Sequence, residues 1–222
     1  RVTRPQTMRV SFVGLLGEGV SAKDLILFTI RELSASGGAG YAIEFAGPAI
    51  EALPVEARLT LCNMTTELSA FTGLIAPDQK VLDYCAGRRY APQAEVWHQA
   101  NQHWQSLRSD EGAAFDQEHH FDIGSLKPQL SWGTSPHHCV DWDAAIPHAS
   151  DAPDASASTA WQRAQDYMGV TPGSQLSDYA LDAAFIGSCT NSRLSDLQLA
   201  AAYLEHTGYK VAKGVKALCV PG

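Results

Sequence analysis

The chain has 222 residues, of which 45% are hydrophobic and 18% charged, a composition typical of a globular protein with one large core or two modest ones. Acidic residues outnumber basic ones by 24 to 16, and no run of Lys or Arg offsets the net charge of −8, which excludes nucleic acid as an expected partner. The longest apolar runs, such as 25–28, are far too short to span a bilayer, and no signal-peptide pattern opens the chain. We therefore expect a cytoplasmic protein without membrane contact.

The first third of the chain predicts alternating strands and helices. Residues 8–13 alternate as a strand does, and Ser21 and Asp24 cap a helix that runs through Leu33 to a stop at Gly37-Gly38. A second strand is expected over 41–45. The glycines between this helix and strand do not form a dinucleotide-binding fingerprint, because they follow a helix where that motif follows a strand.

A second helix is predicted over 55–71, with Pro54 in its first turn and Gly73 as its stop. Asn63 and Glu67 are four residues apart and are expected on one face of this helix, where two polar groups converge on an apolar stripe. A solvated helix face explains the same pattern equally well. Further helices are expected over 80–86 and 95–107, the latter carrying Trp97 and Trp104 for packing against a core or another helix.

The middle of the chain offers no clear site. Residues 109–122 are rich in acidic side chains and are expected to form a solvated loop. The histidines at 119–120 and the His-His-Cys run at 137–139 do not have the spacing of a standard zinc site. Residues 148–158 are small, polar and Pro-containing, which favours a linker, and a helix is expected over 159–168.

The last forty residues predict a strand over 183–187, a helix over 193–206 capped by Gly208, and a strand over 215–220. This order is typical of a parallel βαβ unit. Cys189 lies between the first strand and the helix, where unpaired backbone N–H groups favour a thiolate that binds metal, although a buried apolar cysteine is the simpler explanation.

The other cysteines are expected to be structural. The total of five is odd, the spacing is wide and no Cys-x-x-Cys motif is present, so neither disulfides nor a complete metal site is predicted. The chain begins at Arg1 without Met and stops directly after the apolar run at 215–220, and we expect it to be a fragment of a longer protein. The four cysteines in question are Cys62, Cys85, Cys139 and Cys219.

Six separated segments, in order, resemble the large subunits of 3-isopropylmalate dehydratases, a branch of the aconitase family. They run over nearly the whole chain and include Leu-Cys-Asn-Met-Thr-Thr-Glu at 61–67 and Phe-Ile-Gly-Ser-Cys-Thr-Asn-Ser at 185–192. The remaining four are at 40–47, 73–78, 109–112 and 131–136. The resemblance implies an α/β fold, with aconitase-like three-layer α/β/α domains and mainly parallel sheets, the second domain being truncated.

The resemblance also implies a function and a set of site residues. The family holds a [4Fe–4S] cluster with three cysteines, of which Cys189 matches the first, while the other two belong to a downstream Cys-x-x-Cys that this chain lacks. Asn63 matches an amide that approaches the cluster, and Glu67 a carboxylate that handles protons, in the isomerisation of 2-isopropylmalate to 3-isopropylmalate by dehydration and rehydration in leucine biosynthesis. A separate small subunit supplies further groups, so this chain alone is expected to be inactive.

Three alternatives stay open at this point. A homoaconitase or an aconitase-type hydratase would share the same residues, an isolated non-catalytic domain would bind no cluster, and a nucleotide-binding domain would use the final βαβ unit. The expected organisation is an aconitase-like domain over 1–125, a connecting segment and linker over 126–158, and the start of the next aconitase-like domain over 159–222. In the family the cluster lies at the interface between such domains.

Overall fold

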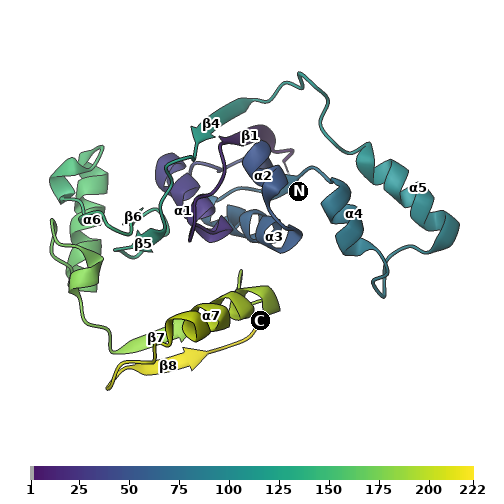
Figure 1. The fold of residues 1–222 in the computed structure, drawn as a ribbon. Coiled ribbons are helices and arrows are strands. Elements are labelled where there is room, and N and C mark those ends of the chain that lie inside the picture. The colour runs from purple at the N-terminus through teal and green to yellow at the C-terminus, as the bar shows by residue number, and fades with distance from the viewer. Residues whose placement is uncertain (1–2) are drawn as a thin grey trace.

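The computed structural model describes residues 3–222 and contains a central parallel sheet (Figure 1). Its strands are β1 (Gln6–Val13), β2 (Tyr41–Ala46), β3 (Thr72–Ile75) and β4 (Gln117–Asp122), in the spatial order β3-β2-β1-β4. All three strand pairs are parallel. The predicted α/β class with mainly parallel sheets is therefore confirmed.

The core of the central region lies between this sheet and the helices α1 (Ala22–Leu33) and α3 (Val55–Asn63). Alternate residues of β1 are fully buried, as the period of two in a strand requires. Each fully buried side chain of this size stabilises the fold by roughly 1.5–3 kcal/mol. The buried set includes Met8, Val10, Phe12, Leu25, Ile26, Ile30, Ile43, Phe45, Leu61 and Leu68.

Helix α1 begins where the sequence predicts, because Ser21 and Asp24 form a capping box. The Ser21 backbone N–H donates to Asp24 Oδ2 at 2.8 Å, and the Asp24 N–H donates to Ser21 Oγ at 3.4 Å. The helix ends at Leu33, since Ser34 has a φ of 68° and leaves the helical region, so the predicted stop at Gly37 is too late.

The second predicted helix is shorter than expected. Helix α3 ends at Asn63 and continues as a 3₁₀ helix, η1 (Met64–Leu68), which stops where Ser69 adopts a left-handed conformation. Gly73 is not the stop but lies inside β3, where an added Cβ would approach Thr65 Cγ2 to 2.6 Å. Glycine is therefore required for close packing of β3 on η1. The short helix α2 (Pro48–Ala52) precedes α3 and was not predicted.

Strand β4 corrects the expectation of a solvated loop over 109–122. Its half-buried residues alternate with exposed ones, and the Phe121 ring stacks on Phe12 with centroids 6.0 Å apart. Asp116, just before the strand, accepts hydrogen bonds from the Thr7 backbone N–H at 2.7 Å and the Thr7 hydroxyl at 3.0 Å. The local sequence is acidic and disfavours a strand, but β4 forms because it pairs with β1, which is more than a hundred residues away.

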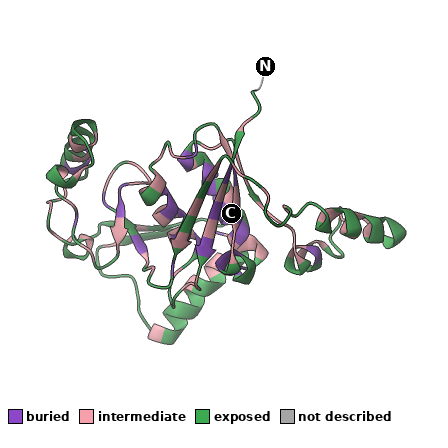
Figure 2. Ribbon diagram, turned by 90° about the horizontal axis from the view of Figure 1, so that it is seen from above, coloured by how far each residue is buried: buried purple, intermediate pink, exposed green. Residues whose placement is uncertain are grey.

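Helices α4 (Gln79–Cys85) and α5 (Ala94–Gln105) follow β3 and match their predicted positions. Helix α5 extends away from the central sheet and has no buried residue (Figure 2). Trp97 and Trp104 contact each other edge to face, with centroids 5.8 Å apart. Both rings are half-buried, so within the described residues the first expected environment, a core, is wrong, and the second, packing against another helix, stays a prediction.

A second hydrophobic cluster joins the connecting segment to a long helix. The connecting segment contains the antiparallel strands β5 (Gln129–Ser131) and β6 (Cys139–Asp141). Trp132, directly after β5, and Ile146, after β6, pack against Ala164 of α6 (Ala155–Met168). Asp154 caps this helix by accepting from the Ala157 N–H at 2.8 Å, and the 3₁₀ helix η2 (Ala149–Asp151) lies just before it. The predicted linker at 148–158 is therefore largely helical, because an N-cap converts its small residues into a first turn.

The C-terminal region contains β7 (Ala183–Ile186), α7 (Leu194–Thr207) and β8 (Lys216–Cys219), after a short 3₁₀ helix η3 (Leu176–Asp178). The two strands pair in parallel, which confirms the predicted βαβ unit, and Gly208 caps α7 with a φ of 67°. None of these three elements has a buried residue. No helix between residues 3 and 222 is both long and apolar enough to cross a membrane.

Candidate active site

Asn63 and Glu67 lie at the junction between α3 and η1. Asn63 is the last residue of α3 and is exposed, and Glu67 follows within the 3₁₀ turn and is half-buried. The predicted continuous helical face is therefore replaced by two helical segments of different pitch. The Thr66 hydroxyl lies 3.1 Å from the Asn63 carbonyl oxygen and 2.8 Å from Glu67 Oε2, so one side chain contacts both predicted site residues and orients the carboxylate.

Cys189 lies in the loop between β7 and α7, and its side chain is exposed. Helix α7 begins at Leu194, so Cys189 is outside its first turn, where the favourable effect of a helix N-terminus on a thiolate is confined. The loop is instead organised by Ser188. Its hydroxyl accepts from the backbone N–H groups of Thr190 at 3.1 Å and Asn191 at 3.0 Å, which closes a tight turn around Cys189.

The Cys189 loop, residues 188–193, docks on α3. Arg193 Nη1 donates to Thr60 Oγ1 at 3.0 Å, and Asn191 Nδ2 donates to the same oxygen at 3.3 Å. Ser195, in the first turn of α7, donates to the Glu56 carboxylate one turn earlier on α3. The structure thus brings the cysteine loop onto the helix that ends at Asn63, although no hydrogen bond among residues 3–222 joins Cys189 itself to Asn63 or Glu67.

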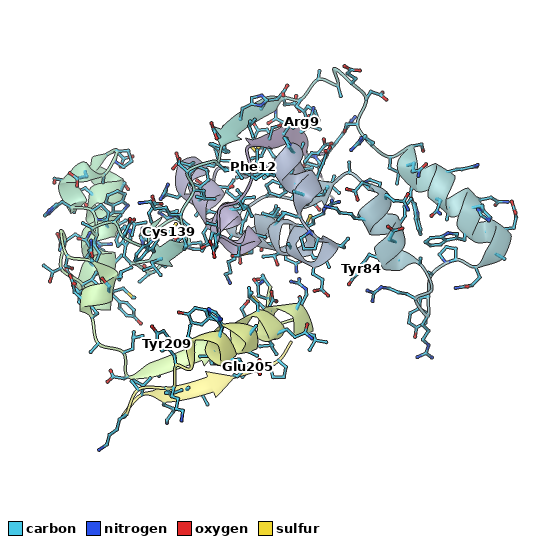
Figure 3. All side chains as sticks on the ribbon, in the orientation of Figure 1. Arg9, Phe12, Tyr84, Cys139, Glu205 and Tyr209 are labelled. Atoms are coloured by element: carbon cyan, nitrogen blue, oxygen red, sulfur yellow. The ribbon has the colours of Figure 1, made fainter. Side chains whose placement is uncertain are left out.

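The remaining cysteines differ in their ability to bind metal. Burial raises the pKa of the Cys62 and Cys139 thiols to about 11, which keeps both protonated near neutral pH. Cys139, labelled in Figure 3, lies on β6 and donates weakly to the Leu27 carbonyl at 3.5 Å. Cys85 is half-buried, and Cys219 is exposed on β8. These environments agree with a structural role for Cys62 and Cys139.

A three-cysteine cluster site is not complete in this chain. Across residues 3–222 no group of three or more His, Cys, Asp or Glu side chains is placed to hold a metal ion. The exposed thiol of Cys189 has the donor chemistry that one iron ligand requires. The residues described therefore fit one ligand of a [4Fe–4S] cluster and not the whole set.

The histidines at 137 and 138 are held by aromatic packing. His138 is 4% exposed and stacks on Trp132 with centroids 4.6 Å apart, and His137 Nδ1 lies 2.7 Å from Ser135 Oγ. Burial, with a smaller effect from the His137 charge, lowers the pKa of His138 to about 4. The ring is therefore neutral at physiological pH.

A charged cluster at the carboxyl ends of β2 and β3 was missed by the sequence analysis. It surrounds a cavity of about 350 Å³ whose lining includes Arg9, Glu44 and Arg58. Of these, Arg9 is labelled in Figure 3. Arg58 is 4% exposed and donates to Asp78 Oδ2 at 2.6 Å and to the Leu53 carbonyl at 3.1 Å. Burial acts to raise the pKa of Asp78, but the Arg58 hydrogen bond and charge and the Val81 N–H outweigh it and hold that pKa below its ordinary value.

This cluster connects segments that no local pattern links. Arg58 and Asp78 are twenty residues apart, and Ser109 donates to the Glu44 carboxylate across an even longer separation. Since every guanidinium in it faces a carboxylate, the cluster stabilises the packing of α3, α4 and the 109–112 loop. Thr60 was missed for the same reason, because only the folded chain places it beside residues 190–193.

Comparison with known proteins identifies the family of this chain. A model of the aconitase family (aconitate hydratase) matches residues 1–222. The 3-isopropylmalate dehydratase large subunit 1 of Bradyrhizobium diazoefficiens is 52% identical over 219 residues, which cover 99% of this chain and 46% of that protein. The chain thus spans about half the length of this curated relative. The match over its whole length shows that the chain belongs to the aconitase family.

Proposed function

We propose that this chain is part of a hydro-lyase that isomerises 2-isopropylmalate to 3-isopropylmalate by dehydration and rehydration. Family membership and the 52% identity to a 3-isopropylmalate dehydratase large subunit support the reaction class. The observation that carries the proposal is the docking of the Cys189 loop on α3, because it brings two sequence-distant site segments into one unit. A homoaconitase or another aconitase-type hydratase is the alternative within the same family.

The proposed roles follow from residue chemistry. Hydroxide is a poor leaving group, so its loss requires a proton donor, and Glu67 is the carboxyl group that we assign to this task. The Thr66 hydroxyl restrains Glu67, which a proton-transfer group needs for a reproducible geometry. Asn63 is assigned to contact the reacting centre through its amide. Cys189 is assigned as one of three ligands of a [4Fe–4S] cluster, which when bound supplies a Lewis-acidic iron.

The rest of the site is proposed to come from outside these residues. The name of the relative includes the words large subunit, and we propose a small subunit of 3-isopropylmalate dehydratase as the partner of this chain, in the cytoplasm. We propose three units, 1–125, 126–158 and 159–222. The second and third units are in contact, because Trp132 and Ala164 of α6 belong to one hydrophobic cluster. The chain alone is proposed to be inactive.

The role of Glu67 is tested in a longer protein that contains this chain, assembled with its small subunit. The Glu67→Gln variant should lower kcat by about 10²–10⁴, the range expected for loss of a general acid–base, with a small change in KM. The matched control is Glu118→Gln, an exposed acid on β4, which should leave kcat unchanged. An unaltered kcat in Glu67→Gln would remove this residue from the mechanism, and a preference for citrate or homoaconitate would favour the alternative.

Cluster binding by the chain itself is a separate question. Because Cys189 is the one cysteine of this sequence that matches a cluster ligand of the family, we expect little or no stable iron and sulfide after anaerobic reconstitution of residues 1–222. The longer protein should take up about four iron and four sulfide per chain, as a [4Fe–4S] centre requires. Substitution of Cys189 by Ser should abolish that uptake, whereas Cys139→Ser should not. Full uptake by the Cys189→Ser protein would exclude the proposed ligand.

A further inference from the structure

Within residues 3–222, all side-chain hydrogen bonds between α3 and the Cys189 loop involve one group, the Thr60 hydroxyl. Thr60 is 1% exposed and lies one helical turn before Asn63. Its oxygen accepts from Arg193 Nη1 at 3.0 Å and from Asn191 Nδ2 at 3.3 Å, two groups on the far side of Cys189 from β7.

The hydrogen-bonding capacity of this hydroxyl is fully used. A threonine hydroxyl can accept two hydrogen bonds and donate one. Both acceptor positions of Thr60 face the loop, and its proton is directed at two carbonyl oxygens at equal distance, Thr190 O and Glu56 O, each 3.4 Å away. Loss of the hydroxyl would therefore remove the acceptor from two half-buried donors, one of them the charged Arg193 guanidinium, whose hydrogen bonds are stronger than those of neutral groups.

Among residues 3–222 no other side chain of α3 bonds to the loop itself; Ser195, two residues beyond it, donates to Glu56, and the Ser192 carbonyl accepts from the Gly222 N–H at 2.8 Å. Within the described residues the Arg193 side chain has no other hydrogen-bond acceptor, and Asn191 Nδ2 has only a longer contact of 3.5 Å to Asp196 Oδ1. Asn191 also donates its backbone N–H to Ser188, so restraint at Asn191 is transmitted across Cys189 to the residue before it. Fixing Asn191 therefore fixes the backbone on both sides of the cysteine.

We propose that Thr60 is the positioning residue that fixes the Cys189 loop on the helix carrying Asn63. The proposal rests on the proposed function only for the meaning of Cys189 as a ligand. The contacts themselves are independent of any cluster. Within residues 3–222 the Thr60 side chain forms no hydrogen bond with Cys189, Asn63 or Glu67, and it acts through Asn191 and Arg193.

The test is amide hydrogen exchange of peptides spanning 188–193 in the whole chain. In Thr60→Val, which keeps the shape and removes the hydroxyl, exchange there should accelerate by about 10-fold or more, since a hydrogen bond to a charged group is lost. Thr60→Ser should restore slow exchange. The matched control is Thr29→Val, because Thr29 is also a buried helical threonine but bonds only to Leu25 of its own helix, at 2.8 Å.

The loop-side variant Arg193→Met gives a second measurement that leaves the core of α3 intact. It should accelerate amide exchange at 188–193. In the double variant with Thr60→Val, the loss of protection against exchange should be smaller than the sum of the losses in the two single variants. Unchanged exchange in Arg193→Met, or failure of Thr60→Ser to restore protection, overturns the proposal. If Thr60→Val does not fold, Arg193→Met decides alone. Because this measurement needs no cluster or substrate, it is separate from the iron-uptake and turnover tests of the proposed function.

Discussion

The central region at 6–122 and the C-terminal region at 183–219 are both built from parallel strands joined by a helix, yet they differ in burial. In the central region β1 buries every second residue, and Phe12 is completely buried. In the C-terminal region Phe185 of β7 is 61% exposed, and the sheet has two strands. Parallel sheets are stable when both faces are covered, so the comparison shows that correct local structure does not by itself create a core.

The C-terminal region is instead attached by polar contacts to α3. Thr190, whose carbonyl accepts from Thr60, is buried, and so is Ser192 in the same loop, although the neighbouring strands and helix have no buried residue. The central region is therefore stabilised by its own core, whereas the C-terminal region is stabilised in part by its contacts with α3.

The largest expected difference between the two regions comes from phenylalanine truncation. Phe12→Ala should lower the free energy of unfolding by about 3–5 kcal/mol, because it leaves a cavity in the core. Phe185→Ala should change it by less than about 0.5 kcal/mol, because that ring is mostly in water. Urea unfolding measures both. Equal losses would contradict the contrast between a packed and an unpacked sheet.

The buried ion pair of the central region gives the next largest effect. Arg58→Ala should destabilise the protein by about 2–4 kcal/mol, because it removes the charge that pairs with the Asp78 carboxylate and the donor to the Leu53 carbonyl, while the Glu51 carbonyl keeps its bond from Lys80 Nζ. The matched variant Arg108→Ala removes an exposed pair with Glu51 at 3.3 Å and should cost less than about 1 kcal/mol. A similar cost for both would show that burial does not distinguish these pairs.

Acid should loosen the segment that joins the two regions. The folded-state pKa of His138 is about 4, below its ordinary value of 6.5, so the unfolded chain binds the proton more readily. The contribution of neutral His138 to the free energy of unfolding is fully present above pH 6.5 and is lost progressively as the pH falls toward 4. At pH 5 the loss is about 2 kcal/mol.

Replacement of the titrating ring isolates this effect. A His138→Phe variant should show a flatter dependence of the unfolding midpoint on pH between 6.5 and 4.5, while His120→Gln, at an exposed position on β4, should keep the original slope. Thermal unfolding followed by tryptophan fluorescence reports on Trp132, which contacts His138. An identical slope in His138→Phe would assign the pH dependence to other groups.

The smallest expected difference between the two regions comes from removing a helix cap in each. Ser21→Ala removes the cap of α1 and should lower global stability by about 1 kcal/mol. Asp196→Ala removes the acceptor for the Arg193 backbone N–H at 2.9 Å at the start of α7, and should accelerate local exchange there while leaving global unfolding within about 0.5 kcal/mol. A global loss from Asp196→Ala would mean that the C-terminal region unfolds together with the core.

The sequence by itself determined the elements whose signals are local. The capping box at Ser21, the alternation in β1 and the Gly208 cap of α7 depend on residues within one or two turns, and the structure has each of them. The family was also recognised from the sequence and is shown by the comparisons, whereas the roles of Asn63, Glu67 and Cys189 stay proposals that rest on that resemblance.

Only the tertiary structure decided the features that depend on distant partners. Strand β4 forms against its acidic sequence because β1 supplies its hydrogen bonds, and α3 ends at Asn63 where η1 and β3 pack closely. Thr60 has no distinguishing local pattern, and its role arises from residues 130 or more positions away. Local propensity depends on a few neighbouring residues, whereas strand pairing and burial depend on which distant segments come into contact. Those contacts are not encoded in any local pattern of a single sequence.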